Sequence, residues 1–321
     1  MTRQDAIQQL EALEASFSGT IGVAASWLGA PGESPAWAHV PALRALGEGR
    51  RPGRADQPRD GAEPLRYRAR EPFAAASVIK LPILCEVWRQ ARAGRLSLGD
   101  RIRLTAEDQV GGSGVLKDLT PGLELSVRDL AVLMISVSDN TATNMLIDRI
   151  GGPEPVNAFA AQLGLEQTLL AGKLQVRPEQ YGPLQRKGLR STTSPEDMAR
   201  LLALLHRAAV PGLSEGDHWE ILDILTRQQH LPSIGRYLPF DPDSVEDREP
   251  VGAVVGSKSG SIRGVRNDVG IVWTPAGAYA IALMSRDCRD LRFHPENEAE
   301  VVLGRAGLVV YRYFVGEASA A

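Results

Sequence analysis

The chain has 321 residues, of which 43% are hydrophobic and 23% charged, and its formal net charge is −3 at pH 7 with a pI near 6.0. These values are close to those of average soluble proteins and exclude a disordered, collagen-like or coiled-coil chain. The small negative charge lacks the basic footprint of a nucleic-acid-binding protein. No run approaches the roughly eighteen apolar residues of a membrane span, so we expect neither a nucleic-acid nor a membrane partner.

The first seventeen residues predict an amphipathic helix, because Ile7, Leu10, Leu13 and Phe17 recur at helical spacing. This segment has neither the apolar core nor the cleavage site of a signal peptide, so we expect a cytoplasmic protein. The two cysteines lie in apolar runs and are expected to be buried free thiols rather than a disulfide.

Strand character follows the first helix from Gly19 to Leu28. Residues 44–64 are rich in Arg, Gly, Pro and Asp and contain little to bury, which predicts a mobile surface insertion. A second strand is expected from Leu65 to Arg70.

Helical periodicity dominates the middle of the chain and predicts helices at residues 78–92, 126–136, 141–150, 154–163, 195–208 and 218–229. Ser126 with Asp129 forms a near capping box, and Ser194 before Pro195 is a typical helix start. Strands return at 251–257, 268–273 and 279–285, before a last helix at 296–314.

Strands at both ends around a helical middle predict the fold class. We expect an α/β chain of the α+β type, with one antiparallel sheet built from both termini, flanked by helices, and an all-helical subdomain inserted. Residues 1–321 would form a single domain. Its sheet subdomain would comprise 19–76 and 251–321, and its mainly helical subdomain 77–250.

Three short segments carry the chemistry: Ser77-Val-Ile-Lys80, Ser138-Asp139-Asn140 and Lys258-Ser259-Gly260. The first places a hydroxyl and an amine three residues apart on one face of a helix start. A serine hydroxyl becomes a good nucleophile when a neighbouring base takes its proton, and a lysine with a lowered pKa can be that base. The chain has only five lysines, and two of them stand in these segments.

In this order the three segments match the pattern of class A β-lactamases and penicillin-binding proteins. The chain therefore resembles the serine β-lactamase and penicillin-binding protein superfamily, most closely class A β-lactamases, over roughly residues 19–314. The resemblance implies the β-lactamase fold, a small-molecule substrate (a β-lactam, an ester or a D-alanyl peptide), no cofactor and no metal. The oligomeric state stays open.

By resemblance, Ser77 is the acylated nucleophile and Lys80 a general base or proton relay. Ser138 would pass a proton to the leaving nitrogen. Substrate binding is assigned to five further residues, Asn140, Lys258, Ser259, Gly260 and Ser261. Asn140 would bind the substrate's side-chain amide, while Lys258 and Ser259 hold its carboxylate. The backbone N–H groups of Ser77 and Ser261 would form the oxyanion hole, and Arg263 and Arg266 could supplement Lys258.

The sequence departs from the family in the omega loop. Class A enzymes hydrolyse the acyl-enzyme with water activated by a glutamate, which an asparagine follows four residues later. The matching stretch, residues 172–188, has no asparagine, and its only carboxylate is Glu179. Aligning Arg177-Pro178 with the family's Glu-Pro places an arginine at the base position. We therefore predict slow or atypical deacylation, with Glu179 as the candidate base.

Three functions follow from these features. The preferred one is a serine hydrolase that opens β-lactam amides through an acyl-enzyme on Ser77. The second is an esterase or D-alanyl peptidase on the same scaffold, favoured by the altered omega loop. The third is a penicillin-binding sensor without turnover.

Overall fold

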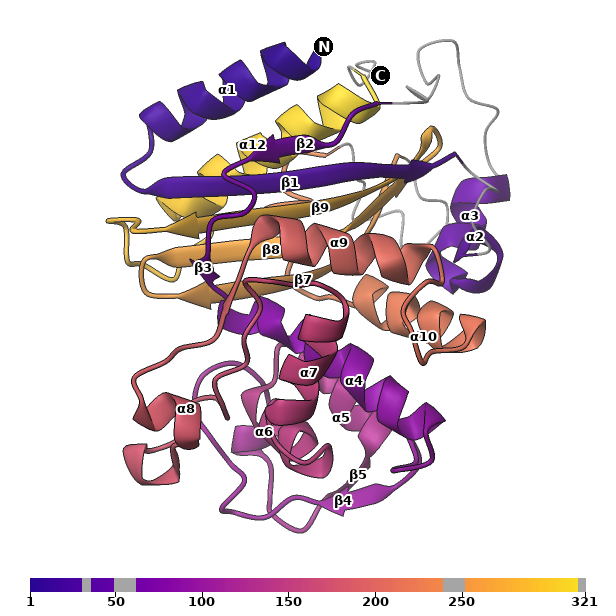
Figure 1. Cartoon of the computed structure of the whole chain (residues 1–321), viewed down its shortest axis with the longest axis vertical. Coiled ribbons are helices and arrows are strands. Elements are labelled where there is room, and N and C mark those ends of the chain that lie inside the picture. The colour runs from indigo at the N-terminus through magenta and orange to yellow at the C-terminus, as the bar shows by residue number, and fades with distance from the viewer. Residues whose placement is uncertain (31–35, 49–61, 239–251, 317–321) are drawn as a thin grey trace.

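A five-stranded antiparallel sheet, with the order β2-β1-β9-β8-β7, is built from both ends of the chain (Figure 1). The computed structural model describes residues 1–30, 36–48, 62–238 and 252–316. The strands are β1 (Thr20–Gly29), β2 (Leu65–Tyr67), β7 (Val254–Ile262), β8 (Val265–Thr274) and β9 (Gly277–Arg286). Helices cover both faces of this sheet, and a mainly helical region lies beside it, which confirms the predicted fold class.

Side chains that alternate along each strand divide the hydrophobic core between the two faces of the sheet. In β9, Ile281 and Leu283 belong to the cluster that includes α1 (Arg3–Ala15) and α12 (Glu298–Phe314). Their neighbours Ala280 and Ala282 belong to the larger cluster on the opposite face. Because successive side chains of a strand point to opposite faces, a central strand covered on both faces is apolar throughout.

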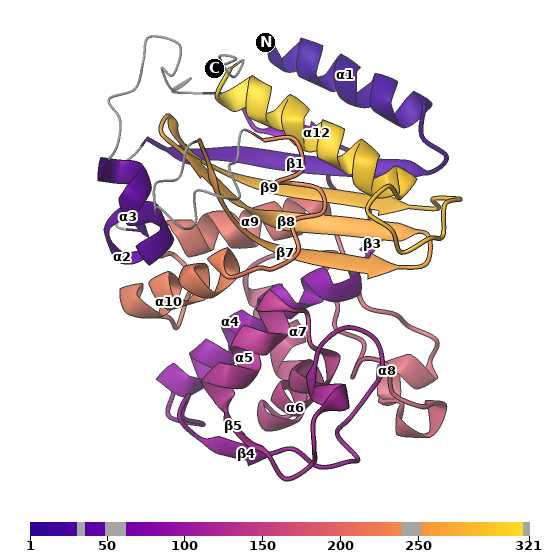
Figure 2. The same cartoon turned by 180° about the vertical axis from the view of Figure 1, so that it is seen from behind.

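Figure 2 shows α1 and α12 on one face of the sheet, while Figure 1 shows α9 (Pro195–His206) and α10 (Glu215–Thr226) on the other. The helical region consists of α4 (Lys80–Arg92), α5 (Val127–Ser136), α6 (Asn140–Arg149), α7 (Glu154–Gln162) and α8 (Pro183–Arg186), with the 3-10 turns η2 (Leu116–Asp118) and η3 (Pro178–Gln180). Helix α4 is buried along most of its length, since it packs against α5, α6 and α7.

Two small sheets were not expected from the sequence. Strands β4 (Arg101–Arg103) and β5 (Glu124–Ser126) pair within the otherwise helical region. Strands β3 (Phe73–Ala74) and β6 (Thr192–Thr193) pair where the helical region joins the sheet. Both pairs are too short to show the period-two pattern that identifies a strand from sequence.

Side-chain caps set the starts of several helices. Ser126 and Asp129 form the expected capping box at α5, and Ser194 caps α9, which begins at Pro195. The predicted start of the next helix at His218 is wrong: α10 begins at Glu215, because Ser214 accepts a hydrogen bond from the Asp217 backbone N–H.

The predicted insertion at 44–64 is partly wrong. Residues 44–48 belong to α3 (Pro41–Glu48), which follows the short α2 (Ala36–His39), while 49–61 lie outside the described residues. Cys85 and Cys288 are buried free thiols, as predicted.

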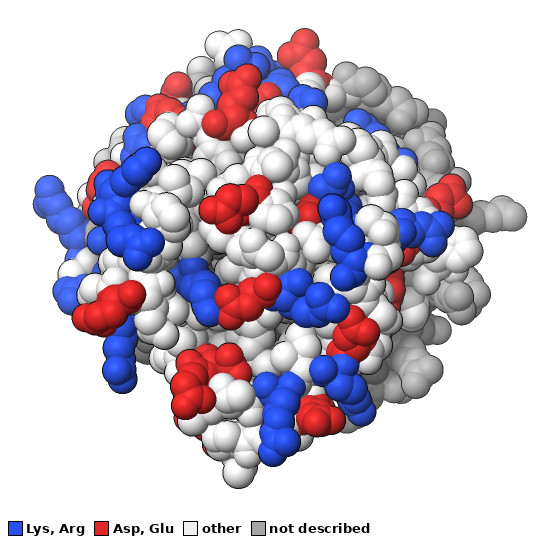
Figure 3. All heavy atoms as spheres, turned by 60° about the horizontal axis from the view of Figure 1, so that its bottom comes forward, with Lys and Arg blue, Asp and Glu red and all other residues white. Residues whose placement is uncertain are grey.

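Surface charge at the end of the molecule formed by the helical region is mixed. Figure 3 shows Lys and Arg side chains interspersed with Asp and Glu across this face. In the described part of the chain, no helix combines the length and apolar character needed to cross a bilayer.

Candidate active site

Ser77 lies in η1 (Ala76–Ile79), a 3-10 turn that leads directly into α4. Residues i and i+3 eclipse each other in a 3-10 helix, so Ser77 and Lys80 share one side of this turn. The preceding residue, Ala76, has a left-handed φ of 45°, a conformation that a non-glycine residue adopts only when its surroundings impose it.

Neighbouring elements hold the segment before Ser77 from two sides. The Asn267 side-chain amide on β8 donates to the carbonyls of Ala74 at 2.8 Å and Ala75 at 3.1 Å. From the other side, the Ala75 N–H donates to the Ser191 carbonyl at 3.0 Å. The backbone that carries Ser77 is therefore fixed by both the sheet and the segment that follows the omega loop.

Lys80 is fully buried and joins the first motif to the second. Its Nζ donates to the Ser138 carbonyl at 2.7 Å, to Ser138 Oγ at 3.1 Å and to Asn140 Oδ1 at 2.8 Å. Burial lowers the pKa of Lys80 well below its usual 10.5, the charge of Lys258 lowers it further, and Asp139 opposes the shift. This lowered pKa favours the neutral amine, which is the form of a lysine that can accept a proton.

The second motif is held in place by Asp139, a residue for which the sequence predicted no role. Its carboxylate accepts hydrogen bonds from the backbone N–H groups of Val115 at 2.7 Å, Leu116 at 2.8 Å and Ala142 at 2.9 Å. Asp139 thereby caps α6 and fixes the backbone of Val115 and Leu116 against it. Ser138 has a left-handed φ of 57°, which strains its backbone. The hydrogen bonds of the Asp139 carboxylate hold the next residue in place and so support this conformation.

The third motif lies on β7, the edge strand that packs against η1. Gly260 is required there, because an added Cβ would come within 2.7 Å of the Ser77 backbone nitrogen and 3.0 Å of that of Val78. The absence of a side chain at this position lets β7 approach the Ser77 N–H, as the predicted oxyanion hole demands.

Lys258 is fully buried on β7, and its Nζ donates to the Ser259 carbonyl at 2.6 Å. Burial lowers the pKa of Lys258 from 10.5 to about 7, although Asp268 on β8 opposes the shift. Burial likewise raises the pKa of Asp268 to about 6, although the hydrogen bond that its carboxylate accepts from the Ile234 N–H opposes this shift. With a pKa of about 7, Lys258 is only partly protonated at neutral pH. An anion bound beside it would favour its charged form.

A cleft of about 800 Å³ opens over these motifs. Of the predicted site residues, Ser77, Asn140 and Ser261 line it. Lys80, Ser138, Lys258 and Gly260 are buried close to the cleft, and Ser259 is half-buried. The structure therefore brings the three motifs together around Ser77.

The omega loop does not place Glu179 in this cleft. Glu179 lies on η3 and is exposed, and it is absent from the described residues that line the cleft. Arg177 is also exposed and is absent from the described residues that line the cleft. Its alignment with the family's glutamate, which acts on water beside the serine, is therefore not supported.

Leu174 is a residue of the omega loop whose backbone is held by a side chain of the second motif's helix. It lines the cleft, and the Asn144 side chain on α6 fixes its backbone on both sides. Asn144 Nδ2 donates to the Leu174 carbonyl and Asn144 Oδ1 accepts from the Leu174 N–H, both at 2.8 Å. No Asp or Glu occurs among the described residues that line the cleft.

Arg263 and Arg266 have different surroundings. Arg263 is exposed and lines the cleft. Arg266 is buried, forms an ion pair with Glu300 at 3.0 Å and donates to the Ile262 carbonyl at 2.8 Å. Arg266 is neutralised by Glu300 in the protein interior, whereas Arg263 reaches the cleft. Of the two arginines, only Arg263 is therefore placed where it could assist Lys258.

Fold and site together are those of a serine hydrolase, in which Ser77 and Lys80 share one side of a helical turn beside the cleft. The family model described as "Beta-lactamase enzyme family" matches residues 51–314, and the chain belongs to this family. A β-lactamase of Rhodobacter capsulatus is 29% identical over 246 residues, which span 77% of this chain and 78% of that protein.

Solved structures show the same similarity. The β-lactamase from Sphaerobacter thermophilus has a TM-score of 0.75 and 31% identity, with 97% of each chain covered. A point mutant of PBP-A, an acyl-enzyme complex with penicillin G, has a TM-score of 0.71 and 25% identity, with 96% of each chain covered.

Proposed function

We propose that this enzyme opens β-lactam amide bonds by forming an ester on Ser77, and that it releases the acyl group slowly. The single observation that carries the first half is Lys80, a buried amine of lowered pKa that is hydrogen-bonded to the second motif one turn from Ser77. The β-lactamases among its relatives support the same reaction.

The proposed acylation step moves one proton along a short path. Ser77 Oγ forms a bond to the carbonyl carbon as its proton passes to Lys80 Nζ, which takes part as the neutral amine and so donates only two hydrogen bonds at the start of the step. The carbon–nitrogen bond then breaks, and the nitrogen takes a proton from Ser138 Oγ, which Lys80 resupplies across their 3.1 Å hydrogen bond. The N–H groups of Ser77 and Ser261 would stabilise the negative charge on the carbonyl oxygen, as preorganised backbone donors do.

The second half of the proposal concerns water. Hydrolysis of the ester needs a base that activates a water molecule beside Ser77. Leu174 occupies the position that Asn144 fixes in the cleft, and a leucine cannot accept a proton. This favours a long-lived acyl-enzyme and keeps the esterase or D-alanyl peptidase as the second candidate, because neither is excluded by the altered omega loop.

Intact-protein mass spectrometry with benzylpenicillin tests both halves. We expect one adduct with the full mass of the penicillin, located on Ser77 by peptide mapping and absent from Ser77→Ala. The adduct should persist after free penicillin is removed. No adduct at millimolar penicillin would contradict the proposal, and rapid loss of the adduct with many turnovers would contradict slow release.

The pH dependence of acylation tests the role of Lys258. We expect the second-order rate constant to rise as Lys80 loses its proton and to fall above pH about 7 as Lys258 loses the charge that holds the substrate carboxylate. An arginine stays protonated, so Lys258→Arg should keep its rate constant up to about pH 9. If the rate constant of a folded Lys258→Arg still fell above pH about 7, the loss of activity at alkaline pH would belong to another group.

A further inference from the structure

The rim of the cleft carries two arginines that take no part in the proposed proton transfers, and of these only Arg263 was expected near the substrate, as a supplement to Lys258. Arg190 lies between α8 and β6, and Arg263 lies in the turn between β7 and β8. Both are exposed and both line the cleft. Within the described part of the chain, neither guanidinium has an ion-pair partner, whereas Lys173, the third cation of the lining, is paired with Asp148.

The two arginines come from segments that flank Ser77. Arg190 precedes Ser191, whose carbonyl accepts from the Ala75 N–H at 3.0 Å, two residues before Ser77. Arg263 follows Gly260, which packs on the Ser77 backbone nitrogen. Both arginines therefore belong to segments that contact the backbone beside Ser77, and both line the cleft into which Ser77 opens.

Arg266 fixes the turn that carries Arg263. Its guanidinium donates to the carbonyls of Ile262 at 2.8 Å and Val265 at 2.9 Å, at the two ends of that turn. It also lies 4.7 Å from the ring centroid of Phe293, which lines the cleft although 68% of it is exposed. The rim on the Arg263 side is thus supported from the interior of the protein.

We infer that this rim selects acyl donors whose side chain carries a negative charge in addition to the carboxylate that Lys258 holds. The inference rests on the proposed function. Among the described residues, neither rim cation has an ion-pair partner and no Asp or Glu lines the cleft, so an anionic side chain in the cleft meets two available positive charges. A solvent-exposed ion pair is weak, so each arginine should favour the anionic substrate by about two- to fivefold.

Benzylpenicillin and carbenicillin form a matched pair for the test, because carbenicillin differs only by a carboxylate on the side chain. The measured quantity is the ratio of their acylation rate constants, carbenicillin over benzylpenicillin. We expect this ratio to fall about two- to fivefold in Arg190→Gln and in Arg263→Gln, and by roughly the product of the two in the double variant.

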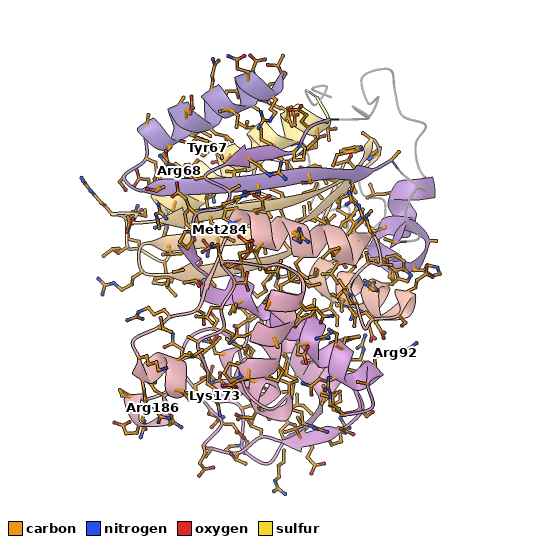
Figure 4. The ribbon with its side chains drawn as sticks, in the orientation of Figure 1. Tyr67, Arg68, Arg92, Lys173, Arg186 and Met284 are labelled. Atoms are coloured by element: carbon orange, nitrogen blue, oxygen red, sulfur yellow. The ribbon has the colours of Figure 1, made fainter. Side chains whose placement is uncertain are left out.

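Arg186→Gln is the control for charge, since Arg186 is exposed on α8, does not line the cleft and is labelled in Figure 4 at the same end of the molecule as Lys173. Its ratio should stay at the wild-type value. Salt near 1 M should lower the wild-type ratio toward that of the double variant, because the Debye length falls to about 3 Å.

The outcomes separate this inference from the proposed function. Acylation by benzylpenicillin with an unchanged ratio in the double variant would overturn the inference alone. An equal loss for both penicillins would also overturn it, because the arginines would then act on their shared part or on the fold. No acylation by either penicillin would overturn the proposed function and this inference with it.

Discussion

Lys80→Met is expected to slow the acylation of Ser77 by roughly 100- to 10,000-fold, the range that one positioned general base contributes. Methionine matches the unbranched length of lysine but cannot accept the serine proton. It also removes the three hydrogen bonds that Lys80 gives to Ser138 and Asn140, so the proton path to the leaving nitrogen is lost as well. The rate constant for adduct formation with benzylpenicillin measures the effect.

Two controls accompany this variant. Lys187→Met removes an exposed lysine of the omega loop that does not line the cleft, and its rate should not change. Thermal unfolding should show that Lys80→Met still folds, since a buried amine with a lowered pKa contributes little through its charge. A folded Lys80→Met with less than a tenfold loss would reject Lys80 as the base.

Leu174→Glu is expected to convert a stoichiometric acylation into turnover. A carboxylate at the position that Asn144 fixes on both sides would stand in the cleft with Ser77 and could activate a water molecule. We expect the steady-state hydrolysis of benzylpenicillin to rise by roughly 100-fold or more, with little change in the acylation rate constant. Loss of the adduct with time and release of product measure the two steps separately.

Leu174→Gln and Glu179→Gln are the matched controls. The glutamine has the shape of the glutamate without its basicity, so turnover should not rise. Glu179→Gln should leave deacylation unchanged, because Glu179 is exposed outside the cleft lining. Slower deacylation in Glu179→Gln would restore Glu179 as the base, and an unchanged adduct lifetime in a folded Leu174→Glu would refute the role given to position 174.

The sequence was most informative where chemistry depends on local spacing. Ser77 and Lys80 are three residues apart, so a single helical turn brings them to one side whatever surrounds it. The Ser126 and Asp129 cap is equally local, and α5 begins where it predicts. The order of strands and helices also follows from patterns of two and 3.6 residues, which is why the fold class could be predicted.

The same reasoning failed for segments without periodicity. In residues 172–188 the alignment rested on Arg177-Pro178, and nothing in the sequence marked Leu174 as the residue held in the cleft. The clamp on Leu174 comes from Asn144, thirty residues earlier and on another element. Asp139 stands inside the second motif and Asn144 follows it by one helical turn, but the residues that they hold lie in other segments, which the motif does not identify.

From the sequence alone, this protein has a serine and an amine poised together at a helix start, in a chain of the α+β type, because both properties arise from neighbours along the chain. Tertiary structure decided which groups reach the cleft. Arg263 and Arg266 are three residues apart, yet Arg266 is buried against Glu300, while Arg263 faces solvent at the rim. The charge and pKa of each group depend on its burial and on partners from distant segments of the chain. A local sequence pattern contains neither, so it could not predict them.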